Sequence, residues 1–169
     1  MRALAFIPLL VLAGCGEAAP ENKAAPAAAA SIAAGQWELT SEVTSFDTAD
    51  DGAPKINTPA GTRTVENVCV GAEGRPPTAL FSGSGYDCEY GTYYVRNGRA
   101  NVTLDCRRPG LQGSVQLAVD GTVEAEEFEF TRDIRTNLVT DGDVTIAARV
   151  TGRRTGDCAA EGGEDGKAG

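Results

Sequence analysis

The sequence predicts an all-β domain: an antiparallel meander of about seven strands, forming a curled sheet or barrel stapled by two disulfides. Three observations carry this prediction. Apolar residues recur at every second position over long stretches, and no segment keeps a 3.6-residue period. Turn sequences containing glycine separate the alternating segments. Four cysteines lie within the alternating region, an even number that suits two disulfides.

The first residues have the layout of a signal peptide. Arg2 supplies a positive charge, and the apolar run from Ala3 to Leu12, which ends in small residues, is shorter than the roughly 20 residues that span a bilayer. Leu12-Ala13-Gly14-Cys15 resembles the bacterial lipobox. We therefore expect residues 1–14 to be removed and acyl chains on Cys15 to anchor the protein in a membrane. An ordinary signal peptide cleaved nearby is the alternative.

This anchor predicts a location on the bacterial cell envelope, facing the periplasm. The glycine after Cys15 resembles outer-membrane sorting. Residues 15–34, rich in Ala and Pro, predict an extended spacer, with a short Ala-rich helix over residues 27–34 as the alternative. Residues 159–169 contain nothing apolar to bury and predict a disordered tail. The folded domain is therefore expected to span residues 35–158.

Composition narrows the possible functions. The chain has 24 acidic and 15 basic residues, a formal net charge of −9. Such acidity argues against nucleic acid as a partner, because nucleic-acid binding requires clustered basic charge. The chain contains no histidine, which excludes His-based triads and most catalytic zinc sites. We expect no enzyme activity, no metal and no cofactor.

The first two strands are expected over residues 35–46 and 61–70. In the first, Trp37, Leu39 and Val43 share one face, with polar residues on the other. The next two strands, residues 86–95 and 99–107, are expected to form a hairpin. Three further strands follow, over residues 112–123, 128–139 and 143–153, each with one apolar and one polar face.

The turn at Arg96-Asn97-Gly98 sets the register of the first hairpin. A three-residue loop would place Tyr94 opposite Ala100, Thr92 opposite Val102, Tyr90 opposite Leu104 and Cys88 opposite Cys106. A two-residue Asn-Gly turn would shift this register by one and separate the cysteines. We therefore predict a Cys88–Cys106 disulfide and, by elimination, a Cys69–Cys158 disulfide.

Two later turns are registered in the same way. A turn over residues 124–127 places Val123 opposite Phe128, so that Asp120-Gly121 becomes a bulge or bend within one long strand. A three-residue loop over residues 140–142 matches the apolar faces of the last two strands. It pairs Leu138 with Val144, Thr136 with Ile146, Ile134 with Ala148 and Arg132 with Val150.

These motifs together resemble the DUF3617 family of bacterial envelope proteins over residues 35–158. The resemblance lies in the start Gly35-Gln36-Trp37-Glu38-Leu39-Thr40, in Val68-Cys69-Val70, Asp87-Cys88 and Asp105-Cys106, and in the closing segment from Thr151 to Cys158. It implies location and architecture and supplies no active site. Residues 71–85, GAEGRPPTALFSGSG, depart from the family pattern and are expected to form a loop.

Arg132 is the most unusual residue, because alternation places its charge on the apolar face between Phe130 and Ile134. An interior charge needs a partner. One hypothesis is that Arg132, with Tyr90 and Tyr94, binds an anionic or amphipathic ligand inside the barrel. The alternatives are a bulge that turns Arg132 outward or an internal carboxylate that pairs with it.

Other acidic groups have structural explanations. Glutamates 124, 126, 127 and 129 suit a solvated turn better than a catalytic pair, and the aspartates of residues 47–51 and 141–143 lack the spacing of a calcium loop. Three functions remain. The first is a binding or interaction module of the envelope with an unknown protein partner, the second a carrier or sensor of a small ligand, and the third, least favoured, an enzyme.

Overall fold

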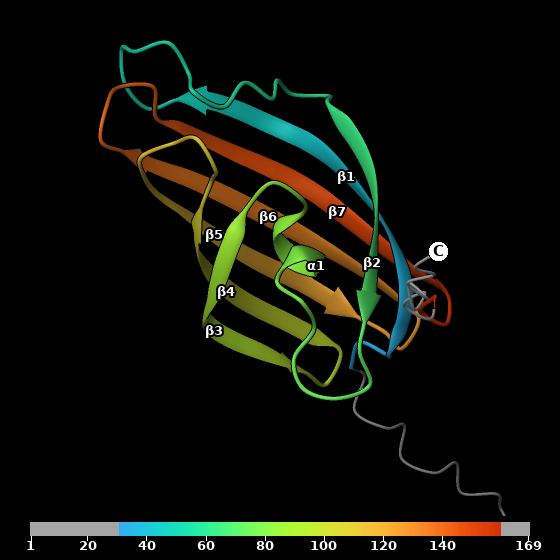
Figure 1. Ribbon diagram of the computed structural model, residues 1–169. Coiled ribbons are helices and arrows are strands. Elements are labelled where there is room, and N and C mark those ends of the chain that lie inside the picture. The colour runs from blue at the N-terminus through green and yellow to red at the C-terminus, as the bar shows by residue number, and fades with distance from the viewer. Residues whose placement is uncertain (1–30, 160–169) are drawn as a thin grey trace, which may run out of the picture.

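Residues 31–159 are described by the computed structural model, which contains seven antiparallel β-strands and one short helix (Figure 1). The elements are β1 (Gly35–Thr48), β2 (Arg63–Val70), α1 (Ala79–Ser82), β3 (Asp87–Arg96), β4 (Arg99–Arg107), β5 (Gly113–Val123), β6 (Glu127–Leu138) and β7 (Val144–Gly156). The predicted all-β class and its seven strands are confirmed.

All seven strands belong to one strongly curved sheet with the order β2-β1-β7-β6-β5-β4-β3. Strands β2 and β3 are its two edges and do not pair with each other within the described residues. The sheet is therefore curled but not closed, so of the two predicted forms, a curled sheet or a barrel, the structure has the curled sheet. Residues 71–86 connect the two edges and carry α1 across the concave side of the sheet (Figure 1).

The hairpin between β3 and β4 turns over two residues, not the predicted three. Asn97 and Gly98 both have positive φ angles, 56° and 74°, as a type I′ turn requires. Tyr94 consequently faces Asn101 instead of Ala100 and lies on the outer face of the sheet.

A β-bulge at Gly91 restores the predicted register farther from the turn. Thr92 pairs with Thr103, but Tyr90 pairs with Leu104, so Gly91 has no partner of its own. The Thr92 N–H donates to Thr103 Oγ1 at 2.8 Å, and a Cβ on Gly91 would lie only 2.9 Å from that oxygen. The expectation that a two-residue turn would separate the cysteines is therefore wrong.

The register of β6 and β7 differs from the predicted one by two residues, which keeps every side chain on its predicted face. Ile134 pairs with Ile146, and Arg132 pairs with Ala148 instead of Val150. The connection between the strands is longer than expected because the Asp143 carboxylate replaces ladder bonds. It accepts hydrogen bonds from the Leu138 N–H at 2.9 Å and from Thr136 Oγ1 at 2.8 Å.

The β5–β6 hairpin has the predicted register, with Val123 opposite Phe128. Residues Asp120 and Gly121 lie within one continuous strand, as predicted, but no bulge or shift occurs there. Glycine is required because a Cβ at residue 121 would overlap the Glu129 carbonyl oxygen and lie only 2.8 Å from Phe130 Cα, and these backbone atoms cannot move aside without shifting the strand.

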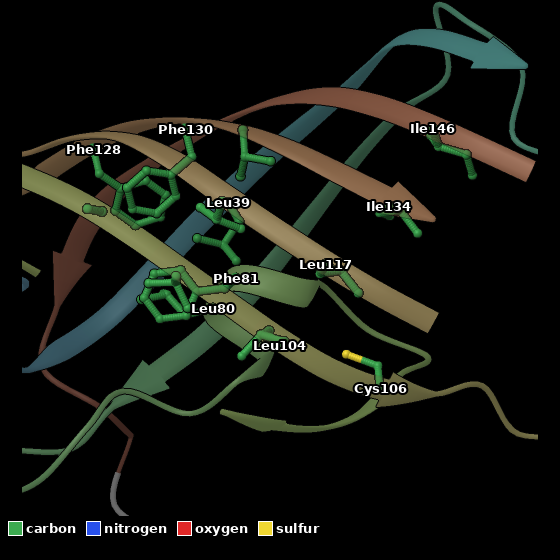
Figure 2. Close-up of a cluster of buried hydrophobic side chains, with 14 of the residues drawn as sticks. Leu39, Leu80, Phe81, Leu104, Cys106, Leu117, Phe128, Phe130, Ile134 and Ile146 are labelled. Atoms are coloured by element: carbon green, nitrogen blue, oxygen red, sulfur yellow. The ribbon is translucent and has the colours of Figure 1, made fainter. Parts of the chain in front are cut away.

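The core fills the concave face, and α1 contributes its centre. Leu80 and Phe81 are 0% and 1% exposed and pack against the inward side chains of the sheet (Figure 2). Burial of each contributes about 1.5–3 kcal/mol. Gly83, with φ 73°, ends this helical turn. The expectation that residues 71–85 form only a loop is therefore wrong in part.

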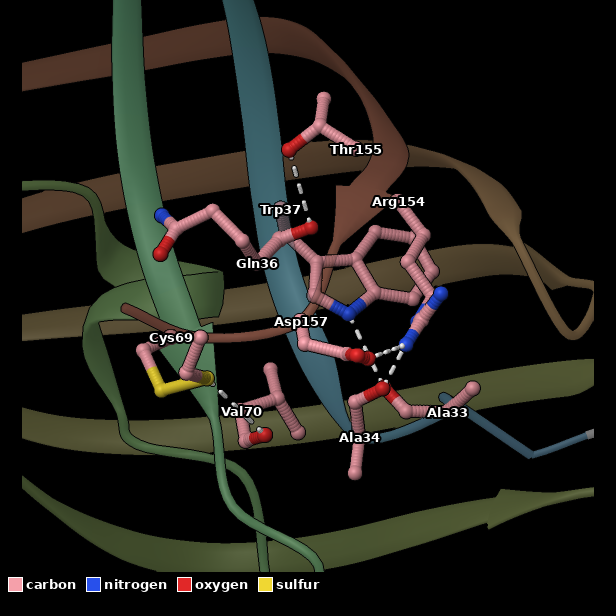
Figure 3. The surroundings of a disulfide bond; sticks show 10 residues. Ala33, Ala34, Gln36, Trp37, Cys69, Val70, Arg154, Thr155 and Asp157 are labelled. Carbon is pink, nitrogen blue, oxygen red and sulfur yellow. Dashed lines mark hydrogen bonds and ion pairs between the residues drawn. A yellow bond between two sulfur atoms is a disulfide. The ribbon is translucent and has the colours of Figure 1, made fainter. Parts of the chain in front are cut away.

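Both disulfides have the predicted partners. Cys88 and Cys106 join β3 to β4 across the hairpin. Cys69 near the end of β2 joins Cys158 after β7, with Cα atoms 5.4 Å apart (Figure 3). Gln36 of β1 pairs with Cys69 on one side and with Gly156 on the other, so this second disulfide spans β1.

Several predictions lie outside the described residues. They concern the signal peptide, the lipidation of Cys15, residues 15–30 of the spacer and nearly all of the tail. Residues 31–34 are not helical, so the alternative helix does not extend over them. No helix within residues 31–159 has the length and apolar character needed to cross a membrane.

Candidate functional site

Arg132 lies on the concave face of β6, as alternation predicts. Its neighbours across the sheet are Val119 of β5 and Ala148 of β7, and the small Ala148 side chain leaves room beside it. The alternative that a bulge turns Arg132 outward is wrong, because the β6 register runs without a shift through this residue.

The Arg132 guanidinium has few partners for a group so deeply placed. Its Nη2 donates to Ser41 Oγ at 2.7 Å, and its Nη1 donates to the Phe81 carbonyl at 3.3 Å. These bonds occupy two of its five N–H donors. Nε is shielded from solvent and has no acceptor in the described part of the chain. Because buried polar groups are nearly always paired, this donor set is incomplete.

No carboxylate of residues 31–159 forms an ion pair with Arg132, so the predicted alternative of an internal pair is not realised there. Burial lowers the pKa of the Arg132 guanidinium below its usual value, whereas Tyr86 and Glu66 oppose that change. An arginine nevertheless stays protonated at neutral pH. The site therefore contains a half-buried positive charge with spare donors, of which Nε is fully shielded from solvent.

A pocket of about 190 Å³ opens beside Arg132, between the end of α1, β2 and the sheet. Its apolar side consists of Val43, Ile134, Ile146 and Ala148. Its polar side contains hydroxyl groups, one acid and two arginines, namely Ser41, Thr58, Thr62, Thr64, Glu66, Ser82, Ser84, Tyr86, Arg108 and Arg132. The pocket is thus amphipathic and small, below the ~300–1,000 Å³ that is typical for drug-sized ligands.

Two groups at this pocket are held by local interactions. The Arg108 guanidinium lies 5.2 Å from the centre of the Tyr86 ring and donates from Nη1 to the Tyr86 hydroxyl at 3.2 Å. The Glu66 carboxylate accepts hydrogen bonds from the Ser84 N–H and hydroxyl group. Their side chains are therefore fixed before any ligand arrives.

A family model described as "Protein of unknown function (DUF3617)" matches residues 32–158, from just before β1 to Cys158. The chain belongs to the DUF3617 family. Neither a curated protein nor a solved structure matches it.

Tyr90 of the DUF3617 domain lies on the concave face, as predicted, but it does not line the Arg132 pocket. Its hydroxyl donates to the Pro76 carbonyl at 2.7 Å, and its ring packs edge-on against Tyr93 and Phe81. The Phe81 ring also packs at a tilt of 31° against Phe130, so an aromatic cluster fills this part of the concave face. Burial raises the pKa of Tyr90. Tyr90 is therefore a core residue.

Tyr94 is 45% exposed and lies on the outer face, so its predicted place beside Arg132 is wrong. The physical reason is the two-residue turn, which places Tyr93 inward in its stead. The Arg75 guanidinium lies 5.3 Å from the centre of the Tyr93 ring and 5.5 Å from that of Tyr90. Only Arg132 of the three predicted ligand-binding residues lines the pocket.

Glu66, Ser82, Ser84, Tyr86 and Arg108 were not predicted as site residues. They come from β2, from α1 and the residues after it, and from the position just after β4. Alternation along a strand predicts only which residues share a face of the sheet. Ser82, Ser84 and Tyr86 reach the pocket through the crossing of residues 71–86 over the sheet, whereas Glu66 reaches it from the edge strand β2. The sole sequence signal was the run Ser82-Gly83-Ser84 after two apolar residues.

A larger depression of about 410 Å³ lies on the convex face, over β4, β5 and β6. Its charged groups, including Asp105, Asp133 and Arg135, are exposed to solvent. Exposed charges are already hydrated and leave no unmet demand for a ligand. The Arg132 pocket is for this reason the stronger candidate.

The acidic segments have structural roles. Glu129 forms an ion pair with Arg149 on the outer face at 2.6 Å. The Asp50 carboxylate accepts hydrogen bonds from the N–H groups of Gly142 and Asp143, which fixes the β6–β7 connection. Within residues 31–159 no group of three or more Cys, Asp or Glu residues is placed to hold a metal ion.

Proposed function

We propose that this DUF3617 protein is a non-catalytic binding protein of the bacterial cell envelope that holds a small anionic ligand in the Arg132 pocket. It is anchored through acyl chains on Cys15 to the outer membrane and faces the periplasm. The proposal rests on one observation above all. A deeply placed guanidinium with spare donors lines an amphipathic pocket, and no carboxylate of the described residues pairs with it.

The chemistry of the pocket favours an anion with an apolar portion. A carboxylate can take two parallel hydrogen bonds from the planar guanidinium, which is the strongest arrangement for such a pair. The aliphatic residues Val43, Ile134 and Ile146 then cover the rest of the ligand. The small volume limits the ligand to a metabolite-sized molecule.

The absence of histidine supports binding over catalysis. Ser82 and Ser84 have hydroxyl groups at the pocket, but neither has a histidine to act as a general base anywhere in the chain. The Ser82 hydroxyl instead donates to the Gly83 carbonyl at 2.8 Å.

NMR titration of the isotope-labelled full chain, purified in detergent, tests this function. Acetate, propionate, isovalerate and phosphate serve as probes. We expect shifts of the backbone amide signals of Glu66, Gly83 and Ser84, which border the pocket. Saturable shifts with a carboxylate, confined to these residues, would support the proposal.

Arg132→Gln should abolish the shifts, and Arg132→Lys should weaken binding about tenfold, because lysine keeps the charge but not the planar fork. Arg149→Gln is the matched control, since Arg149 lies on the outer face of β7. Equal binding by the Arg132→Gln and Arg149→Gln variants, or no shift with any probe, would refute the function.

A further inference from the structure

The Arg132 pocket contains an acidic side chain as well as two arginines. Glu66 of β2 lines the same cavity, and its carboxylate is held in place by the Ser84 N–H at 3.0 Å and by the Ser84 hydroxyl. A carboxylate has about four acceptor positions, so the two hydrogen bonds from Ser84 leave it able to accept further hydrogen bonds from a cationic group of a ligand. A plain anion would be repelled by this group.

The charged groups of Arg132 and Glu66 lie on either side of one small space next to Gly83. A Cβ built on Gly83 would lie 3.1 Å from Arg132 Nη1 and 3.2 Å from Glu66 Oε2. The two side chains nevertheless form no ion pair, because no N–O distance between them is 4 Å or less. A positive donor and a negative acceptor thus stand side by side at the pocket and remain available to a ligand.

The lining of the pocket also includes aliphatic side chains. Val43, Ile134 and Ile146 are each less than 10% exposed and belong to three different strands, β1, β6 and β7. A ligand that fills the cavity therefore meets a guanidinium, a carboxylate and a hydrocarbon surface at once.

We propose that the ligand is a small zwitterion, an α-amino acid with an aliphatic side chain. Its carboxylate binds Arg132, its ammonium group binds Glu66, and its side chain packs on the aliphatic surface. This inference rests on the proposed function and specifies its ligand class. It explains why an anion-binding pocket contains Glu66, whose charge would otherwise oppose binding.

Three ligands that share the same branched four-carbon group separate the contributions. Valine has both charges, isovalerate lacks the ammonium group, and isobutylamine lacks the carboxylate. Titration calorimetry on the purified full chain should give the tightest binding for valine, weaker binding by about tenfold for isovalerate, and none for isobutylamine.

Glu66→Gln should weaken valine binding about tenfold and leave isovalerate binding equal or tighter, whereas Glu42→Gln on the outer face of β1 should change neither. Arg132→Gln should abolish binding of both ligands. If isovalerate binds as well as valine and Glu66→Gln has no effect, the zwitterion inference is wrong while the anion-binding function stands. If neither ligand binds, both are wrong.

Discussion

Deletion of Gly91 should leave the β3–β4 hairpin intact. Gly91 is the unpartnered residue of the bulge, so its removal lets Thr92–Thr103 and Tyr90–Leu104 become consecutive pairs. Tyr90 keeps its inward position, and Cys88 stays opposite Cys106. The variant loses the hydrogen bond from the Thr92 N–H to Thr103 Oγ1, worth about 1 kcal/mol, and gains a regular ladder. We expect the free energy of unfolding to change by no more than about 1 kcal/mol.

Urea unfolding and mass spectrometry after thiol alkylation measure the two consequences. Deletion of the exposed Glu89 from the same strand is the matched control. That shorter strand can keep Cys88 opposite Cys106 only by turning Tyr90 outward, which costs about 2 kcal/mol or more. Alkylated Cys88 and Cys106 in the Gly91 deletion, or a stability loss equal to that of the control, would show that the bulge does not set the register.

Three further predictions follow from the structure. Tyr93→Ala should lower the free energy of unfolding by about 2 kcal/mol and Tyr94→Ala by less than about 0.5 kcal/mol, because only the first ring packs inward; a reversed order in urea unfolding would contradict the register. Gly121→Ala should lower the free energy of unfolding by about 3 kcal/mol or more, since its methyl group would overlap the Glu129 carbonyl oxygen and crowd the Phe130 backbone, and an unchanged melting temperature would contradict this. Asp50 accepts backbone hydrogen bonds that lower the pKa of its carboxyl group below the usual value of 3.8 in the folded protein. The contribution of these bonds to the free energy of unfolding is therefore complete well above pH 3.8 and is lost as the pH falls through the lowered pKa. The stability difference between the wild type and Asp50→Asn should therefore shrink on acidification, and a constant difference across that range would refute the assignment.

The strands could be predicted because each has a single buried face, which alternation in the sequence reveals. Residues 99–107 form a strand with the predicted boundaries, and Val123 opposes Phe128 as expected. The disulfide between Cys88 and Cys106 was predicted through an incorrect turn. A bulge at Gly91 offset the error, because one extra residue in the strand has the same effect on register as one extra residue in the loop.

The candidate site could be predicted only where it lies on the sheet. Arg132 breaks the apolar alternation of β6 and is therefore visible in the sequence. Glu66 and Ser84 reach the pocket from an edge strand and from the crossing segment, whose position depends on tertiary packing of Leu80 and Phe81. No periodic pattern encodes that packing. Whether the sheet closes or stays open could not be predicted for the same reason, since the number of strands alone does not decide whether the two edge strands pair.

The position of β1 between β2 and β7 has a mechanical consequence. A tether attached upstream of residue 31 would pull on β1 along its own axis, which loads the hydrogen bonds to both neighbouring strands in shear. Near that end the Cys69–Cys158 bond links the strands on either side, and Arg154 Nε donates to the Ala34 carbonyl at 2.7 Å (Figure 3). Neither neighbour can peel away first, so such a pull would be spread over β1 and its two neighbouring strands and not concentrated at one pair of residues.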